Sequence, residues 1–306
     1  MPLSLLSAPE FSQHVVNGLT LGAIYALIAL GYTMVYGILK FINFAHGEVL
    51  MAGTYAALFL YDAARMSLPA PVAFALAVAA GMAASAFLGV AVERLAYRPL
   101  RNAPRLAPLL SAIGVSIILS NLAAVFFGTK SRRFEYPFDN TAWNLGGVSV
   151  TPHQVLVFAV AIVLMAALKV FVDFTRTGKA MRATSENLPA ASLMGIDTER
   201  IIMLTFAVGS ALAAAAGILI AMEYKVYPTM GSLAGMKAFI AAVLGGIGSV
   251  EGAMLGGVVL GLLETLAVAL LGIPEGLKDT IAFGVLILIL LFRPQGILGR
   301  NFREKV

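Results

Sequence analysis

The chain has 306 residues, of which 60% are hydrophobic and only 12% are charged, and its mean hydropathy is +0.91. Soluble domains carry about a quarter of their residues as charges, so this composition excludes a soluble globular protein. The absence of cysteine excludes a disulfide framework, a thiolate metal site and a cysteine nucleophile. The net charge of +5 is better explained by basic loops on one side of a membrane than by a nucleic-acid surface.

Apolar segments recur along the whole chain at lengths near the roughly 20 residues that a bilayer-crossing helix needs. They are apolar on every face rather than alternating, which indicates helices and not a transmembrane barrel. We therefore predict an all-α, polytopic transmembrane bundle of about eight to nine spans, forming one transmembrane domain over 1–306. The predicted spans are 14–38, 41–61, 70–92, 107–128, 153–173, 201–223, 237–248, 253–271 and 279–293.

The segment 237–248 is too short to cross a bilayer alone. Either it borrows residues at its outer end, or it is a half-helix of the kind that lines a cavity in transporters.

Basic residues gather in three segments, which the positive-inside rule places in the cytoplasm. These are loop 93–106, loop 174–200 and the tail after 293, the last with Arg300, Arg303 and Lys305. Counting spans from them puts loop 129–152 and the N-terminus outside and the 39–46 turn inside.

Two stretches of the chain resemble each other. "AHGEVLMAGTYAAL" (45–58) and "GSVEGAMLGGVVLG" (248–261) each join a small-residue turn with one glutamate to a glycine-containing helix. Both helices are expected to run outward from the cytoplasmic face. This pattern indicates a two-fold internal repeat of the same sense, a common plan in transporters.

Three polar residues, Asn43, His46 and Glu48, lie within six residues at the junction of two predicted spans. One interpretation is a turn at the membrane surface, in which Asn43 caps the next helix, Gly47 takes a positive φ and Glu48 faces the helix dipole. The other interpretation is a polar constriction of a transport pathway. The residues alone leave both open.

Glu264, in "LGLLETLAVALL", is the one acid placed deep inside a predicted span. Intramembrane acids are candidates for functional sites. Here the alternatives are a pathway residue, a buried hydrogen-bonding residue or a contact to a partner subunit. Gly-x-x-x-Gly patterns at 18–22, 252–256 and 257–261 predict close helix contacts, within the chain or between subunits.

The loop "GKAMRATSENLPAASLMGID" (178–197) contains a predicted short amphipathic helix. Ser185 is its expected N-cap, and its apolar contacts are expected from Leu188, Ala191, Leu193 and Met194. An exposed Leu-Met pair marks a partner surface, unless the helix packs back on the bundle.

Within this loop, Ala190-Ala191 followed by Gly195 resembles the Ala-Ala-x-x-x-Gly core of the cytoplasmic coupling loop in ABC importer permeases, although Pro189 stands where that motif often has glutamate. Four longer strings, in order and spacing, resemble the LivH-type permeases of branched-chain amino acid ABC importers. They are "FINFAHGEVLMAGTYAA", "GKAMRATSENLPAASLMGI", "GGIGSVEGAMLGG" and "FRPQGILG". The resemblance makes 174–200 the coupling loop, with the ATPase-contact residues Pro189, Ala190, Ala191, Leu193, Met194 and Gly195.

The resemblance implies a permease subunit in a bacterial inner membrane that forms the translocation pathway for branched-chain or related small amino acids. It also implies a second related permease, two cytoplasmic ATP-binding subunits and a periplasmic substrate-binding protein, beside membrane lipid and with no nucleic acid. No enzyme activity and no cofactor are expected in this chain, because the phosphate loop of an ATPase is missing and "GTKS" and "TGKA" are only partial matches.

Two other functions stay open. An ion-coupled secondary transporter would use Glu48, His46 and Glu264 to carry the coupling ion, and an ABC permease could carry urea or short amides. An intramembrane enzyme is disfavoured, because the chain has no cysteine and no His-Glu-x-x-His motif.

Overall fold

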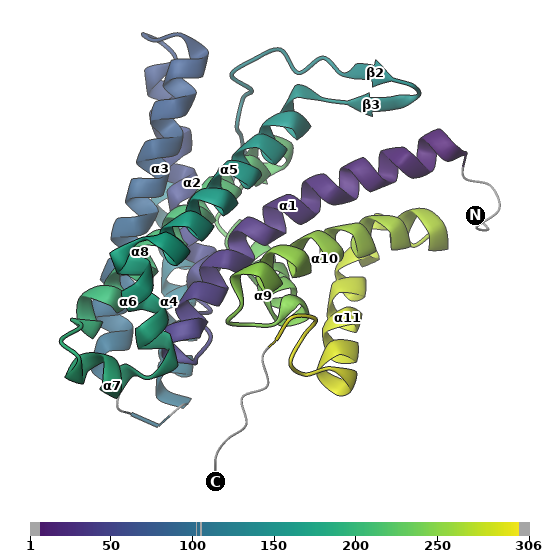
Figure 1. The fold of residues 1–306 in the computed structure, drawn as a ribbon. Coiled ribbons are helices and arrows are strands. Elements are labelled where there is room, and N and C mark those ends of the chain that lie inside the picture. The colour runs from purple at the N-terminus through teal and green to yellow at the C-terminus, as the bar shows by residue number, and fades with distance from the viewer. Residues whose placement is uncertain (1–6, 102, 105, 300–306) are drawn as a thin grey trace.

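The computed structural model describes residues 7–101, 103–104 and 106–299, and over these ranges the chain is a helical bundle with four short strands (Figure 1). The predicted all-α membrane fold is confirmed, since six of the described helices are long and apolar enough to cross a bilayer. Arg105, Arg300, Arg303 and Lys305, used above to orient the chain, lie outside the described residues.

The helices follow the predicted spans closely. Their bounds are α1 Ala8–Leu39, α2 His46–Ala64, α3 Ala70–Val92, α4 Leu106–Phe127, α5 Pro152–Phe174, α6 Arg176–Glu186, α7 Leu188–Leu193, α8 Thr198–Glu223, α9 Met230–Gly245, α10 Val250–Leu271 and α11 Lys278–Phe292. A π-helical turn, Glu93–Tyr97, and a 3-10 turn, Arg98–Leu100, prolong α3, and a 3-10 turn, Glu275–Leu277, precedes α11.

The strands form two antiparallel pairs. β1 (Arg132–Arg133) pairs with β4 (Lys225–Val226), and β2 (Trp143–Leu145) forms a hairpin with β3 (Val148–Val150). The first pair joins the loop after α4 to the segment after α8, so these two loops share one end of the bundle.

Helix α2 is enclosed by other helices, because it packs against α3, α8, α9 and α4. It is not among the six helices with a membrane-like hydropathy. A helix surrounded by protein needs no continuous apolar surface, so α2 can carry polar residues that a lipid-facing span could not.

The glycine patterns join helices within this chain. A methyl group at Gly22 of α1 would lie 2.7 Å from the Val258 Cα of α10, and one at Gly257 would collide with Ala26. A methyl group at Gly256 would collide with the Ala241 carbonyl of α9. Small residues let these helices approach closely, which is the intrachain alternative left open above.

The loops predicted to be external meet at one end of the bundle. Gln13, near the start of α1, bonds the backbone of Ser149 in β3 at 2.7 and 3.0 Å. The β2–β3 hairpin and the start of α1 lie together at the upper right of Figure 1.

The loops predicted to be cytoplasmic meet at the other end. Arg98 and Arg101 bind Glu199 at the start of α8, at 2.7 and 2.6 Å. The backbone NH groups of Ile297 and Leu298 donate hydrogen bonds to the carbonyls of Leu244 and Gly245 at the end of α9. The relative placement of the loops is therefore as predicted, and the assignment of this end to the cytoplasm stays a prediction.

Two expectations about elements need correction. The loop 174–200 is mostly helical, because it holds α6 and α7. Ser185 lies inside α6 and caps nothing; α7 is capped by Asn187, whose Oδ1 accepts from the Ala190 NH at 2.9 Å. Of the short segment 237–248, residues 237–245 belong to α9, which begins at Met230 and ends at Gly245. Its 16 residues are fewer than the roughly 20 that a bilayer-crossing helix needs, so the half-helix alternative stays open.

Candidate functional site

Helix α7 presents an apolar tip at the end of the bundle predicted to face the cytoplasm (Figure 1). The side chains of Leu193 and Met194 are 89% and 83% exposed. Ala191 is buried and fixes the other face of α7 to the bundle, so it does not belong to the exposed surface. Gly195 has φ +82°, which suits glycine, and it ends the helix just behind this tip.

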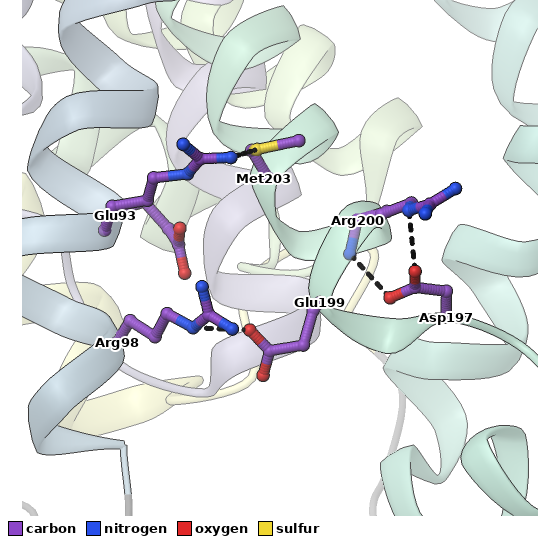
Figure 2. Close-up of a pocket in the computed structure, with 7 residues that line it drawn as sticks. Glu93, Arg98, Asp197, Glu199, Arg200 and Met203 are labelled. Atoms are coloured by element: carbon purple, nitrogen blue, oxygen red, sulfur yellow. Dashed lines mark hydrogen bonds and ion pairs between the residues drawn. The ribbon is translucent and has the colours of Figure 1, made fainter.

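A charged cluster connects the start of α8 to the end of α3. Asp197 caps α8 by accepting from the Arg200 NH at 3.1 Å, and Glu199 in the first turn binds Arg98 (Figure 2). Arg101 binds both Glu199 at 2.6 Å and Glu93 at 2.5 Å. Glu93 and Arg98 also line a small cavity of about 330 Å³. In the sequence, the arginines of loop 93–106 served only to orient the chain, and their acidic partners, Glu93 and Glu199, were not predicted.

The cluster continues into the segment before α2. Tyr97, in the π-helical turn, donates its hydroxyl to the Asn43 Oδ1 at 2.6 Å, and its ring lies 5.2 Å from that of Phe41. Asn43 also accepts from the Ala45 NH at 3.1 Å. The prediction that Asn43 caps α2 is wrong: the N-cap position is Ala45, with no side-chain cap bond.

Gly47 was expected to take a positive φ in a tight turn, and this is also wrong. It lies inside α2 and is not among the described glycines with positive φ. A methyl group there would collide with the Gly231 carbonyl at the start of α9. Glycine is needed at this position for the contact between two helices, not for a turn.

His46 and Glu48 lie in the first turn of α2, and both side chains are 1% exposed. Glu48 Oε1 accepts from the hydroxyls of Ser116 and Ser232, at 2.9 and 2.7 Å. Glu48 Oε2 and His46 Nε2 have no hydrogen-bond partner among the residues that the structure describes. Both side chains are therefore enclosed by neighbouring helices, and the two interpretations of this stretch, a turn at the membrane surface and a constriction of the pathway, stay predictions.

Glu264 belongs to a separate cluster. Its carboxylate accepts from Tyr25 at 2.9 Å and pairs with Lys237 Nζ at 3.1 Å. Lys237 also pairs with Asp279 of α11 at 2.7 Å and lies over the Tyr25 ring. This arrangement fits the buried hydrogen-bonding interpretation of Glu264. Lys237 was missed, although a lysine inside the apolar stretch "GMKAFIAAV" is itself a sequence signal.

The structure thus brings Asn43, His46 and Glu48 together at the start of α2, apart from Glu264, and leaves the tip of α7 exposed. The chain matches the family described as "Branched-chain amino acid transport system / permease component" over residues 14–290.

Relatives of high identity cover nearly the whole chain. It is 48% identical to the high-affinity branched-chain amino acid transport system permease protein BraD of Pseudomonas aeruginosa, over 97% of this chain and 98% of that protein. It is also 48% identical to LivH of Escherichia coli, which carries the same description, with the same coverage. Among solved structures, PsaBC from Streptococcus pneumoniae in complex with Fab is similar over 91% of each chain, at a TM-score of 0.48 and 12% identity.

Proposed function

We infer the role of this chain from the family to which it belongs, the permease components of branched-chain amino acid transport systems. It is a membrane-embedded transport subunit rather than an enzyme. We propose that it forms part of the pathway by which branched-chain or closely related amino acids cross a bacterial inner membrane. The observation that carries this proposal is the 48% identity that extends over 97% of the chain.

The proposed transporter contains ATPase and substrate-binding subunits beside this chain. The sequence has no phosphate loop, so the energy for transport would come from ATP-binding partners. We propose two such subunits, a periplasmic binding protein that delivers the amino acid, and a second related permease that completes the pathway.

We propose the tip of α7 as the surface that contacts an ATPase subunit. Two large apolar side chains, Leu193 and Met194, stand almost fully exposed on a capped helix outside the predicted spans. Exposed apolar side chains of this kind, rimmed by polar residues, are typical of protein interfaces. Pro189 and Ala190 lie on the same exposed surface, while Ala191 and Gly195 set the position and the end of the helix.

A continuous set of contacts supports the coupling of this surface to the bundle. Helix α7 packs against α8, Glu199 of α8 binds Arg98 and Arg101, and Tyr97 in the adjoining turn bonds Asn43 before α2. Rigid-body movement of α7 would therefore pull on the segment that positions the start of α2.

Uptake of radiolabelled leucine tests the proposed function. A strain lacking this gene should lose high-affinity uptake and regain it from a plasmid copy, with unlabelled isoleucine and valine competing and urea and acetamide not competing. Uptake should survive collapse of the ion gradients when ATP is maintained, because the rival ion-coupled mechanism would fail there. Undiminished leucine uptake in the deletion strain would reject the proposal.

Leu193→Arg tests the α7 surface. A charge at the apolar tip should prevent docking of the ATPase, so copurification of the ATPase and leucine uptake should both fall by about tenfold or more. Met66→Arg is a matched control, because Met66 is also exposed, at 86%, but lies in the loop between α2 and α3, beside Arg65, which binds Glu135 of the loop predicted to be external. Normal copurification of the ATPase with Leu193→Arg would show that the contact is elsewhere.

A further inference from the structure

Helices α2 and α9 both begin inside the bundle, and their first turns touch. The His46 ring lies against Gly31 of α1, eight residues before α1 ends at Leu39, which is about 12 Å at the rise of an α-helix. A methyl group at Gly231 of α9 would collide with the Gly47 carbonyl of α2. The two positive helix ends therefore meet within the protein, where they favour a negative charge, here that of the Glu48 carboxylate.

The Glu48 carboxylate lies at this meeting point and is only partly satisfied. It forms no ion pair among the described residues, and its hydrogen bonds come from two serine hydroxyls on Oε1. Oε2, without a partner, points at the start of α9, because a methyl group built on Gly231 would lie 2.6 Å from it. A buried charged oxygen without a partner is costly, so a site of this kind calls for a ligand.

The hydroxyl oxygens of the two serines provide further hydrogen-bond acceptors beside the Glu48 carboxylate. Each hydroxyl donates its one hydrogen to Glu48, so the lone pairs of Ser116 and Ser232 stay free to accept. Oε2 and the two hydroxyl oxygens therefore offer three acceptors, and an alkylammonium group has three N–H donors. Ser232 is exposed at the surface of α9, so only the Ser232 side chain separates the Glu48 carboxylate from the surface of the protein.

We propose that Glu48, Ser116 and Ser232 bind the ammonium group of the amino acid during its passage through the permease. This inference rests on the function proposed above. The contact between Gly47 and Gly231 closes the site in this structure, so α2 and α9 must separate to admit the ligand. The shared hydroxyls keep binding weak enough for release, which transport requires. Urea and short amides carry no ammonium group, so the same chemistry selects amino acids over them.

Direct binding to the assembled transporter without its binding protein tests the ligand chemistry. Saturation-transfer difference NMR suits weak ligands, and the probes are leucine, isopentylamine, which lacks the carboxylate, and isocaproate, which lacks the ammonium. Leucine and isopentylamine should give signals with the wild-type transporter, and Glu48→Gln should abolish both signals. Isocaproate should give no signal with either protein. A signal from isocaproate equal to that of leucine, or leucine and isopentylamine signals that Glu48→Gln leaves unchanged, would overturn the proposal.

Leucine uptake tests the same residues during transport. Glu48→Gln still accepts from both serines but has no charge, and the maximal uptake rate should fall about tenfold. Glu251→Gln is the control, because Glu251 occupies the matching position of α10 but is 55% exposed and pairs with Lys169 at 2.9 Å. Its uptake should stay near the wild-type rate.

A pair of serine variants covers the case in which Glu48→Gln does not reach the membrane. Ser232→Thr keeps the hydroxyl and should retain uptake, whereas Ser232→Ala should lose most of it. Equal uptake by these two variants would overturn the proposal. Wild-type cells that take up no leucine would instead defeat the proposed function itself, whereas normal uptake by Glu48→Gln would defeat only the ammonium site.

Discussion

Of the three buried glutamates that the structure describes, two lie within predicted spans, Glu48 and Glu264, and the protein compensates their charges in different ways. Glu264 is paired with Lys237 and bonded by Tyr25, so its negative charge is met by a positive one across α1, α9 and α10. Glu48 is met by the hydroxyls of Ser116 and Ser232 and keeps one oxygen without a partner. Burial alone therefore does not tell what an acid does. The ion pair of Glu264 joins helices, whereas Glu48, which has no ion pair among the described residues, is the one that we propose to bind a ligand.

The two similar stretches of sequence show the same contrast. Glu48 and Glu251 stand at matching positions, each in the first turn of a helix after a glycine-containing segment. Yet Glu251 is exposed and pairs with Lys169, whereas Glu48 is enclosed. Ser249 caps α10 through the Gly252 NH, and no side chain caps α2. The internal repeat stays a prediction, and similar strings here occupy different environments.

The largest effect is expected from removing the cation of the Glu264 cluster. Lys237→Met removes the cation that is paired with the buried Glu264, which should cost about 3–5 kcal/mol of stability. The midpoint of thermal unfolding of the purified protein should fall clearly, and its level in the membrane should drop. The double variant Lys237→Met with Glu264→Gln should recover most of the loss, because the uncompensated charge is gone. A single variant as stable as the wild type would show that this pair does not fasten the helices.

A smaller effect is expected where α2 meets α9. Gly231→Ala places a methyl group against the Gly47 carbonyl and Glu48, and such overpacking should cost about 1–3 kcal/mol. Gly284→Ala in α11 is the control, because a methyl group there would contact nothing and alanine favours the helix. The midpoints of thermal unfolding of the two variants are compared, and only that of Gly231→Ala should fall below the wild-type value. Equal stability would mean that α2 and α9 can separate without cost, so their contact would not hold the Glu48 site closed.

The smallest effect is expected from one hydroxyl at Glu48. Ser116→Ala leaves the carboxylate with Ser232 alone, and hydrogen bonds between membrane helices are worth about 0.6 kcal/mol on average. Ser120→Ala is the control, because that hydroxyl bonds only to carbonyls of its own helix. The midpoint of thermal unfolding of Ser116→Ala should be only slightly lower than that of Ser120→Ala. A loss from Ser116→Ala as large as that from Lys237→Met would mean that the hydroxyls are as structural as the lysine.

The sequence by itself determined the elements that depend on local pattern. Runs of apolar residues define the spans, because each must cover about 30 Å of hydrocarbon, and their parity orders the loops on the two ends of the bundle. The pattern Leu-Pro-Ala-Ala-Ser-Leu also predicted the short helix α7 with an apolar, partner-like surface. The ATPase contact itself remains a proposal.

Only the tertiary structure decided which residues meet. That α2 is enclosed depends largely on α8 and α9, which are distant in sequence, so hydropathy could not reveal that Glu48 is buried. The need for glycine at position 47 comes from Gly231, and the partner of Glu264 is Lys237, 27 residues away on another helix. In lipid, helices are selected by close packing and by the pairing of polar groups, and neither can be read from one helix alone.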